Sequence, residues 1–286
     1  MAAQLHYLHK YCRVSRDCKG VAQTLETAIV RFGQSNACPG KPTVDLIATF
    51  HFGEKSYFNE LERAFDQYDL VLFEGIVQRR GQFSNNSSPF IIENRAVAQR
   101  LGLEYQPDVI NYRRPNFAHA DLLWRECRKL MRRQHQDSLF HLPVPEDLKQ
   151  DGMDQQEFNR LTDEGRAELV RNAFAAEPGS EVELKRSEID DMAIGSPDSP
   201  SILITERNKV ALRVLRREFK PTKQRLAILY GVIHMLDFEL HLVEDFGLSR
   251  LEERWLVAWD MRTPALQGVS ENGKCATTSP AKTRVS

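Results

Sequence analysis

The sequence contains no run of about 20 apolar residues, which is the length that a helix needs to cross a bilayer. Its first residues, MAAQLHYLHKYCRVSRD, also lack the apolar core of a secretory signal peptide. Together these two absences predict a cytoplasmic protein with no membrane span in this chain.

Neither sign of charge dominates, because 39 Lys and Arg residues face 40 Asp and Glu residues, which gives a formal net charge of −1. Nucleic-acid-binding domains usually carry a marked excess of positive charge. The composition therefore argues against a nucleic-acid partner.

Cysteine is scarce, and the five residues present are Cys12, Cys18, Cys38, Cys127 and Cys275. They form no CxxC pair, and no histidine lies near them at zinc-finger spacing. This pattern is typical of reduced thiols in a cytosolic protein. A bridge between Cys12 and Cys18 would require an oxidising compartment.

The first part of the chain alternates strand and helix signals. Residues 8–33 predict an antiparallel hairpin, with turn residues DCKG between two β-branched segments. The apolar run 44–50 predicts a strand, 53–68 an amphipathic helix, and 69–75 a second buried strand. Strand, helix and strand in this order form a βαβ unit with a right-handed crossover.

The later part repeats this alternation. The patterns predict a helix over 203–219, a strand over 225–231, a helix over 235–247 and a last strand over 254–261, while 101–116 contains a strand with irregular flanks. We therefore expect an α/β fold of the mixed α+β type, with a central, mostly parallel sheet flanked by helices.

Composition divides the chain into three regions, the second of which contains an insertion. Residues 1–9 form an N-terminal extension, and 10–262 form one folded domain. Within that domain, 143–200 is an acidic, polar segment with Gly and Pro breakers, which predicts a helical insertion or lid. Residues 263–286 are rich in Ser, Thr and Lys and predict a disordered tail.

The two halves of the domain resemble each other in outline. Each has a strand, a small residue three positions before a histidine, and then a helix; the small residues are Ala48 and Gly231. The apolar face of the second helix is expected at Leu236, Leu240, Val243 and Phe246. This similarity predicts two pseudo-repeated halves.

Histidine and glutamate follow the predicted strands. His51 ends one strand, Glu74 the next and His234 a third, and Glu54 lies one helical turn after His51. In an open parallel sheet, side chains just past the carboxyl ends of the strands meet in one crevice. We expect these residues to line such a crevice.

The helix predicted over 203–219 carries a buried cation. Its apolar stripe is Ile204, Ala211 and Leu215. Arg207 falls on the same face, and Asn208 leans toward it. Because a buried guanidinium needs partners, Arg207 should contact a carboxylate such as Glu74 or Glu206, or a ligand's carboxylate, phosphate or developing oxyanion.

Two histidines and one or two carboxylates can hold a divalent metal ion with an open position for water. This ligand set suits Zn, Mn, Co or Fe. His119 and Asp121 are further pocket candidates, although Asp121 or Asn116 could serve only as a helix cap. A histidine at a strand end is also common as a hydrogen-bonded turn residue, so the metal site and a structural network both stay open.

Three segments together resemble the TraB/PrgY/Tiki superfamily, which is related more distantly to erythromycin esterase and ChaN-like proteins. They are DLIATFHFGEKSYFNELERAFDQYDLVLFEG, ERNKVALRVL and ILYGVIHMLDFELHLVEDFG, and the resemblance covers most of residues 10–262. Ala48 stands where the family usually has Gly in its first small-x-x-His motif.

The resemblance implies one α/β domain whose two halves share a site, and a metal-dependent protease activity. By motif match, His51 and His234 would be metal ligands, and Glu74 would be the family's acidic residue. In such a hydrolase, Glu74 or Glu54 would be a further ligand or the general base. Arg207 would stabilise the oxyanion. The ChaN-like branch implies a haem-binding or small-molecule-binding protein instead. The same residues are also compatible with a metal-free esterase that uses a histidine base, or with an inactive scaffold.

Overall fold

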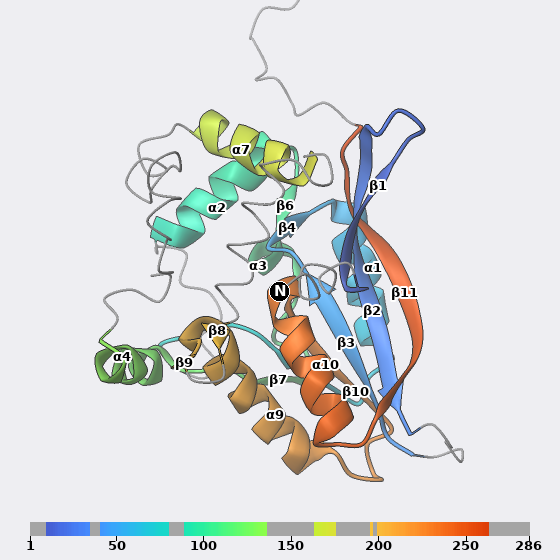
Figure 1. The fold of residues 1–286 in the computed structure, drawn as a ribbon, viewed down its shortest axis with the longest axis vertical. Coiled ribbons are helices and arrows are strands. Elements are labelled where there is room, and N and C mark those ends of the chain that lie inside the picture. Colours follow the sequence, from blue (N-terminus) through green and yellow to red (C-terminus); the bar gives the residue numbers. More distant parts are fainter. Residues whose placement is uncertain are drawn as a thin grey trace, which may run out of the picture.

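The computed structural model describes residues 10–34, 41–79, 89–135, 163–175, 195–196 and 199–262 (Figure 1). Its main sheet has seven strands in the order β1-β2-β3-β10-β5-β7, with β11 also paired to β2. The bounds are β1 Cys12–Arg16, β2 Ala22–Gly33, β3 Thr43–Thr49, β10 Arg225–Gly231, β5 Leu70–Phe73, β7 Phe117–His119 and β11 Ser249–Asp260. With helices on its faces, this sheet confirms the predicted mixed α/β class.

Strands β1 and β2 form the predicted N-terminal hairpin. Its turn is closed by Asp17, whose carboxylate accepts the backbone N–H groups of Lys19 and Val21, each at 2.9 Å. Gly20 has a φ of 81°, a conformation that glycine adopts at little cost. The cysteines on this hairpin, Cys12 and Cys18, are free thiols.

Strands β3, β10, β5 and β7 are parallel to one another. Helix α1 (Lys55–Phe65) follows β3 and precedes β5, as the βαβ pattern predicts. However, β3 and β5 are not neighbours, because β10 lies between them and pairs with both. The second strand-end histidine is thereby placed between the first histidine and the strand-end glutamate.

Helices cover both faces of the sheet. Along β3 the side chains alternate: Ile47 packs with Phe58 and Leu61 of α1, whereas Leu46 packs with Leu215 on the opposite face. That face is covered by α9 (Arg207–Glu218) and α10 (Met235–Glu244) (Figure 1). Each fully buried side chain of this kind contributes roughly 1.5–3 kcal/mol.

Helix α9 begins after a short π-helical segment, η2 (Ile202–Glu206). The apolar stripe predicted for this helix is correct, since Ile204, Ala211 and Leu215 have no exposed surface. Arg207, the first residue of α9, lies on the same buried side. Single π turns often occur at functional sites.

The face predicted for α10 is only partly correct: Leu236 and Phe246 are partly buried and pack against the core, but the other two residues do not. Leu240 and Val243 are 50% and 47% exposed, and the buried residues are Met235, Phe238 and Leu242. The helix carries two overlapping apolar stripes, and the one that faces the sheet is rotated from the predicted one.

The insertion predicted over 143–200 is described only at α7 (Asp163–Ala175), β8 (Gly195–Ser196) and β9 (Ser199–Pro200). Helix α7 packs against α2 (Pro89–Arg100), and its Phe174 ring meets Phe50 edge-on at 5.2 Å. Since Phe50 precedes His51, part of the insertion lies beside the end of β3. The predicted extension 1–9 and tail 263–286 lie outside the described residues.

The strand predicted within 101–116 is only two residues long. It is β6 (Glu104–Tyr105), which pairs with β4 (Phe52–Gly53) just after His51. The other elements are α3 (Gln106–Val109), α4 (Trp124–Arg133) and the 3₁₀ turn η3 (Val232–His234). None of the described helices combines the length and apolar character needed to cross a membrane.

Candidate functional site

The candidate site lies where the four parallel strands end. His51 follows β3, His234 closes the turn after β10, Glu74 follows β5 and Asp121 follows β7. Because these strands run in one direction, all four residues lie at the same edge of the sheet.

Arg207 is the centre of the cluster. Its side chain is 6% exposed, and its Nη2 donates to Asp121 Oδ2 at 2.7 Å and to Glu74 Oε1 at 2.5 Å. Its Nε donates to Asp121 Oδ1 at 3.0 Å. Burial by itself would lower the pKa of Arg207, but the two carboxylates raise it well above the ordinary value. The guanidinium is therefore a permanent buried cation.

Glu74 has a separate partner for each oxygen. Besides the bond from Arg207 to Oε1, the backbone N–H of Gly231 donates to Oε2 at 2.6 Å. Burial would raise the pKa of Glu74, but the charge of Arg207, with the neighbouring His234 and His51, holds it well below its usual value. Glu74 is consequently ionised at neutral pH.

Asp121 is fully buried and is the main partner of Arg207. Its oxygens also accept the backbone N–H groups of Gly75 at 2.8 Å and Leu122 at 2.7 Å. The alternative that Asp121 only caps a helix is not observed, since α4 begins three residues later with Leu123 as its N-cap. His119 donates from Nε2 to the Gly75 carbonyl at 2.6 Å and supports the same turn.

The tautomer of His234 follows from its partners. Asn208 donates from Nδ2 to the His234 carbonyl at 3.1 Å and to Asp237 Oδ2 at 2.8 Å. The amide oxygen of Asn208, 2.6 Å from His234 Nδ1, must therefore accept, and Nδ1 carries the proton. In the neutral ring, Nε2 then has a lone pair.

This lone pair lies close to the charged side chains of the cluster. His234 Nε2 lies 3.4 Å from Arg207 Nη1 and 3.6 Å from Glu74 Oε1. The ring is 1% exposed and packs edge-on against Tyr230 at 5.0 Å. Its orientation is thus fixed on one side by Asn208 and on the other by an aromatic wall.

His51 completes the set from the solvent side. Its side chain is exposed, and it interacts electrostatically with Glu74, Arg207 and His234. Although His51 keeps exposed surface, the protein packed around the strand ends removes part of its hydration and thereby lowers its pKa; Glu74 opposes this effect, and Arg207 and His234 add to it. At pH 7 the imidazole of His51 is therefore neutral and able to accept a proton or bind a metal ion.

Two carboxylates named from the sequence contact other groups. Glu54 precedes α1, and its Oε1 accepts the backbone N–H of Asp260 at 3.2 Å. Glu206 pairs with Lys209 at 2.6 Å. The expectation that Glu206 would neutralise Arg207 is replaced by the observed pairs with Asp121 and Glu74.

Gln106 and Tyr112 extend the wall of the site, although no sequence motif predicts either residue there. The backbone N–H of Gln106 donates to the His51 carbonyl at 2.7 Å, and its Nε2 donates to the Tyr112 hydroxyl at 2.9 Å. Burial and the nearby Glu74 carboxylate raise the pKa of Tyr112. No spacing in the sequence connects these residues to the histidine motifs.

The side chains at the site offer the types of ligand atom that bind divalent metal ions. His51 and His234 can each offer a neutral nitrogen and Glu74 an ionised oxygen, which is the composition of an open catalytic site. With neutral histidines, Glu74, Asp121 and Arg207 together leave one net negative charge. Among the described residues no group of three His, Cys, Asp or Glu side chains is arranged to hold a metal ion, and the Arg207 guanidinium contacts both Glu74 and His234.

Comparisons with family models, curated proteins and solved structures found no match. Any functional assignment for this protein therefore depends on the geometry of the strand-end cluster. Membership of the TraB/PrgY/Tiki superfamily, which the sequence motifs resemble, stays a prediction.

Proposed function

We propose that this protein is a hydrolase of the TraB/Tiki type that cleaves peptide or related acyl bonds at the strand-end cluster. In this proposal His51, His234 and Glu74 hold a divalent metal ion, with Mn, Co, Zn or Fe as candidates. The observation that carries it is the His234 Nε2 lone pair, buried, fixed in one tautomer and 3.6 Å from the ionised Glu74.

Asn208 supports this assignment. Metal-binding histidines usually donate their other ring N–H to a protein acceptor, which fixes the tautomer and the ring orientation. Asn208 accepts from His234 and is itself anchored by Asp237. His234 is thus prepared to present one nitrogen without rotating.

The charge states divide the roles. A bound ion would polarise the scissile carbonyl and activate water. The low pKa of Glu74 makes it a weak proton acceptor at neutral pH, which favours a ligand role over that of general base. Arg207, oriented by Asp121, is placed to stabilise negative charge developing on a substrate oxygen.

A second candidate is metal-free hydrolysis with His51 as the general base. The observation that favours it is the position of Arg207, whose guanidinium already contacts both Glu74 and His234. His51 is neutral at pH 7 and exposed to solvent, as a base acting on water must be. A haem-binding role would also fall to His51, because His234 is 1% exposed.

The test is a hydrolysis assay on chelator-treated protein, with each metal added singly and with peptide and ester substrates. We expect cleavage only after metal is added. Glu74→Gln should lower kcat/KM by about 10²–10³, whereas Glu244→Gln, an exposed carboxylate on α10, should leave it unchanged. Turnover that persists in chelator and is lost in His51→Ala would replace the metal mechanism by the second candidate. No turnover under any condition would contradict both.

A further inference from the structure

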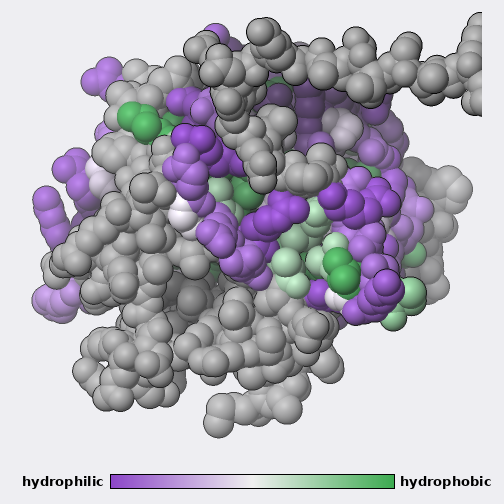
Figure 2. Space-filling model, turned by 90° about the horizontal axis from the view of Figure 1, so that it is seen from above, coloured by the Kyte–Doolittle hydropathy of each residue, from purple (hydrophilic) through white to green (hydrophobic). Residues whose placement is uncertain are grey.

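Helix α4 presents a row of basic side chains to solvent. Arg125, Arg128, Lys129, Arg132 and Arg133 are all exposed, and their positions at i, i+3, i+4, i+7 and i+8 place them on one side of the helix. Helix α4 lies at the left margin of Figure 1, and the outermost coloured side chains on that side of Figure 2 are hydrophilic. These five residues form the basic face of α4.

The opposite side of α4 is packed onto the protein. Trp124, Cys127, Leu130 and Met131 belong to an apolar cluster that also contains Ile202 of η2. Cys127 has no exposed surface. This packing fixes the rotation of the helix about its own axis. The basic face is therefore a fixed, one-sided surface that points away from the core.

The nearby carboxylates are used elsewhere. Glu126, the one acidic residue of α4, accepts the backbone N–H of Leu123 at 2.7 Å at the start of the helix. Glu206 of the neighbouring η2 pairs with Lys209. Within the described part of the chain, none of the five cations of the basic face forms a salt bridge. Because like charges three and four residues apart in a helix repel each other, a polyanion that neutralises them would also stabilise α4.

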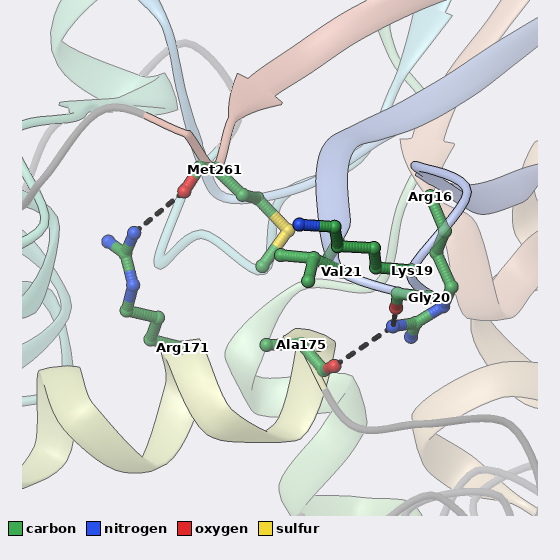
Figure 3. Close-up of a pocket in the computed structure, with 8 residues that line it drawn as sticks. Arg16, Lys19, Gly20, Val21, Arg171, Ala175 and Met261 are labelled. Carbon is green, nitrogen blue, oxygen red and sulfur yellow. Dashed lines mark hydrogen bonds between the residues drawn. The ribbon is translucent and has the colours of Figure 1, made fainter.

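A second group of basic residues lines the pocket between the β1–β2 turn and α7 (Figure 3). There Arg16 donates to the carbonyls of Gly20 and Ala175, and Arg171 donates to the carbonyl of Met261. Those guanidinium groups connect segments of the protein to one another. The cations of the basic face, in contrast, extend into solvent and are accessible to an external partner.

The composition of the basic face selects the kind of partner. Protein–protein interfaces are centred on apolar or aromatic anchors, but none of the exposed large apolar side chains of the described structure belongs to α4. Nucleic-acid-binding domains usually have an excess of positive charge, whereas this chain has a net charge of −1. Clusters of about four to eight Lys and Arg residues on one helix are typical of proteins that bind anionic lipids.

We propose that the basic face of α4 binds the surface of an anionic membrane through the phosphate groups of the lipids. Four of its five residues are arginines, and a guanidinium can bind a phosphate through two N–H groups at once. Since the apolar side of α4 is packed against η2, the helix lies on the headgroups and does not insert. This assignment is independent of the hydrolase proposal.

The test is co-sedimentation of the full-length protein with lipid vesicles at about 0.1 M salt. One vesicle preparation is phosphatidylcholine alone, and the other contains equal parts of phosphatidylcholine and phosphatidylserine. We expect binding to the second preparation and not to the first. The triple variant Arg128→Gln/Lys129→Gln/Arg132→Gln should bind about a hundredfold more weakly, because each basic residue near an anionic membrane contributes roughly a factor of five.

The matched control removes three cations from exposed positions on and just after α9, as Arg213→Gln/Arg217→Gln/Lys220→Gln. It has the same net charge as the α4 variant and should bind as the wild type does. The α4 variant should unfold at the same temperature as the wild type or higher, because fewer like charges repel along the helix.

Three results would overturn the proposal: no binding of the wild type to the anionic vesicles, equal binding to both preparations, or equal loss in the two triple variants. Single-stranded RNA is tested in parallel at the same salt concentration. Tighter binding to RNA than to the vesicles, lost in the α4 variant, would assign the basic face to nucleic acid and would likewise contradict a membrane partner.

Discussion

Replacing Arg207 by methionine should destabilise the fold strongly. Asp121 has no exposed surface and would remain with only the N–H groups of Gly75 and Leu122 as partners. Glu74 would be less affected, since it is 16% exposed and keeps its bond from Gly231. Removing one member of a buried ion pair costs about 3–5 kcal/mol, and we expect Arg207→Met to lie in this range.

The double variant Arg207→Met/Asp121→Asn separates lost packing from an uncompensated charge. Asn removes the charge but keeps an acceptor for only one of the two backbone N–H groups, so the double variant should recover only part of the loss, roughly 1 kcal/mol relative to the single variant. Urea unfolding followed by tryptophan fluorescence measures both values. A single variant that loses less than about 1 kcal/mol would refute the central role given to Arg207.

The pH dependence gives a second check. The pKa of Glu74 is lower in the folded protein than its ordinary value, so its stabilising contribution is present above the unfolded pKa and is lost as pH falls through the folded pKa. Arg207 is the principal cause of that lowering. The stability difference between wild type and Arg207→Met should therefore be full at pH 7 and shrink below about pH 4. A difference that stays constant into acid would contradict the argument.

Three further changes have defined outcomes. Asn208→Ala should remove the acceptor that holds the proton of His234 on Nδ1, so that ¹⁵N NMR shows a mixture of the two tautomers and any activity falls by roughly 10–100-fold. A single tautomer in this variant would argue against the role given to Asn208. The pKa of His51, measured by NMR titration, should lie below its ordinary value of 6.5. The folded protein should therefore lose stability as the pH falls and this histidine is protonated. A pKa above 6.5 would contradict the environment described for His51. Gly53→Ala would place a Cβ 2.9 Å from the Ala258 carbonyl oxygen. The variant should lose about 1–3 kcal/mol of stability, as measured by thermal unfolding. Unchanged stability would mean that the backbone around β4 can move to accommodate the added methyl group.

Much of the fold could be predicted because its strands are short apolar runs with clear boundaries. Patterns in the sequence located the hairpin and strands β3, β5 and β10. The position of β10 between β3 and β5 was not predictable, since apolar periodicity does not specify neighbours. The same limit explains α10, where two apolar stripes are available and only packing decides that Phe238 rather than Leu240 is buried.

The site could be predicted to the extent that parallel strands place their ends together. His51, Glu74 and His234 were located in this way, and helical spacing located Arg207 and Asn208 on a buried face. Asp121 was given too small a role because β7 has only three residues and the pairing with Arg207 spans 86 positions. Such a contact depends on tertiary packing, which a local pattern does not contain.

Metal content tests the central claim most directly. Purified wild-type protein, loaded with each candidate metal and dialysed, should retain about one equivalent by elemental analysis. His234→Ala and the double variant His51→Ala/His234→Ala should lose the metal while keeping the fold by circular dichroism. The control variant His241→Ala changes a partly exposed histidine of α10 that pairs with Asp245, and it should retain the metal. No retained metal in the wild type, or equal retention in the double variant, would contradict the claim that these strand-end histidines form a metal site.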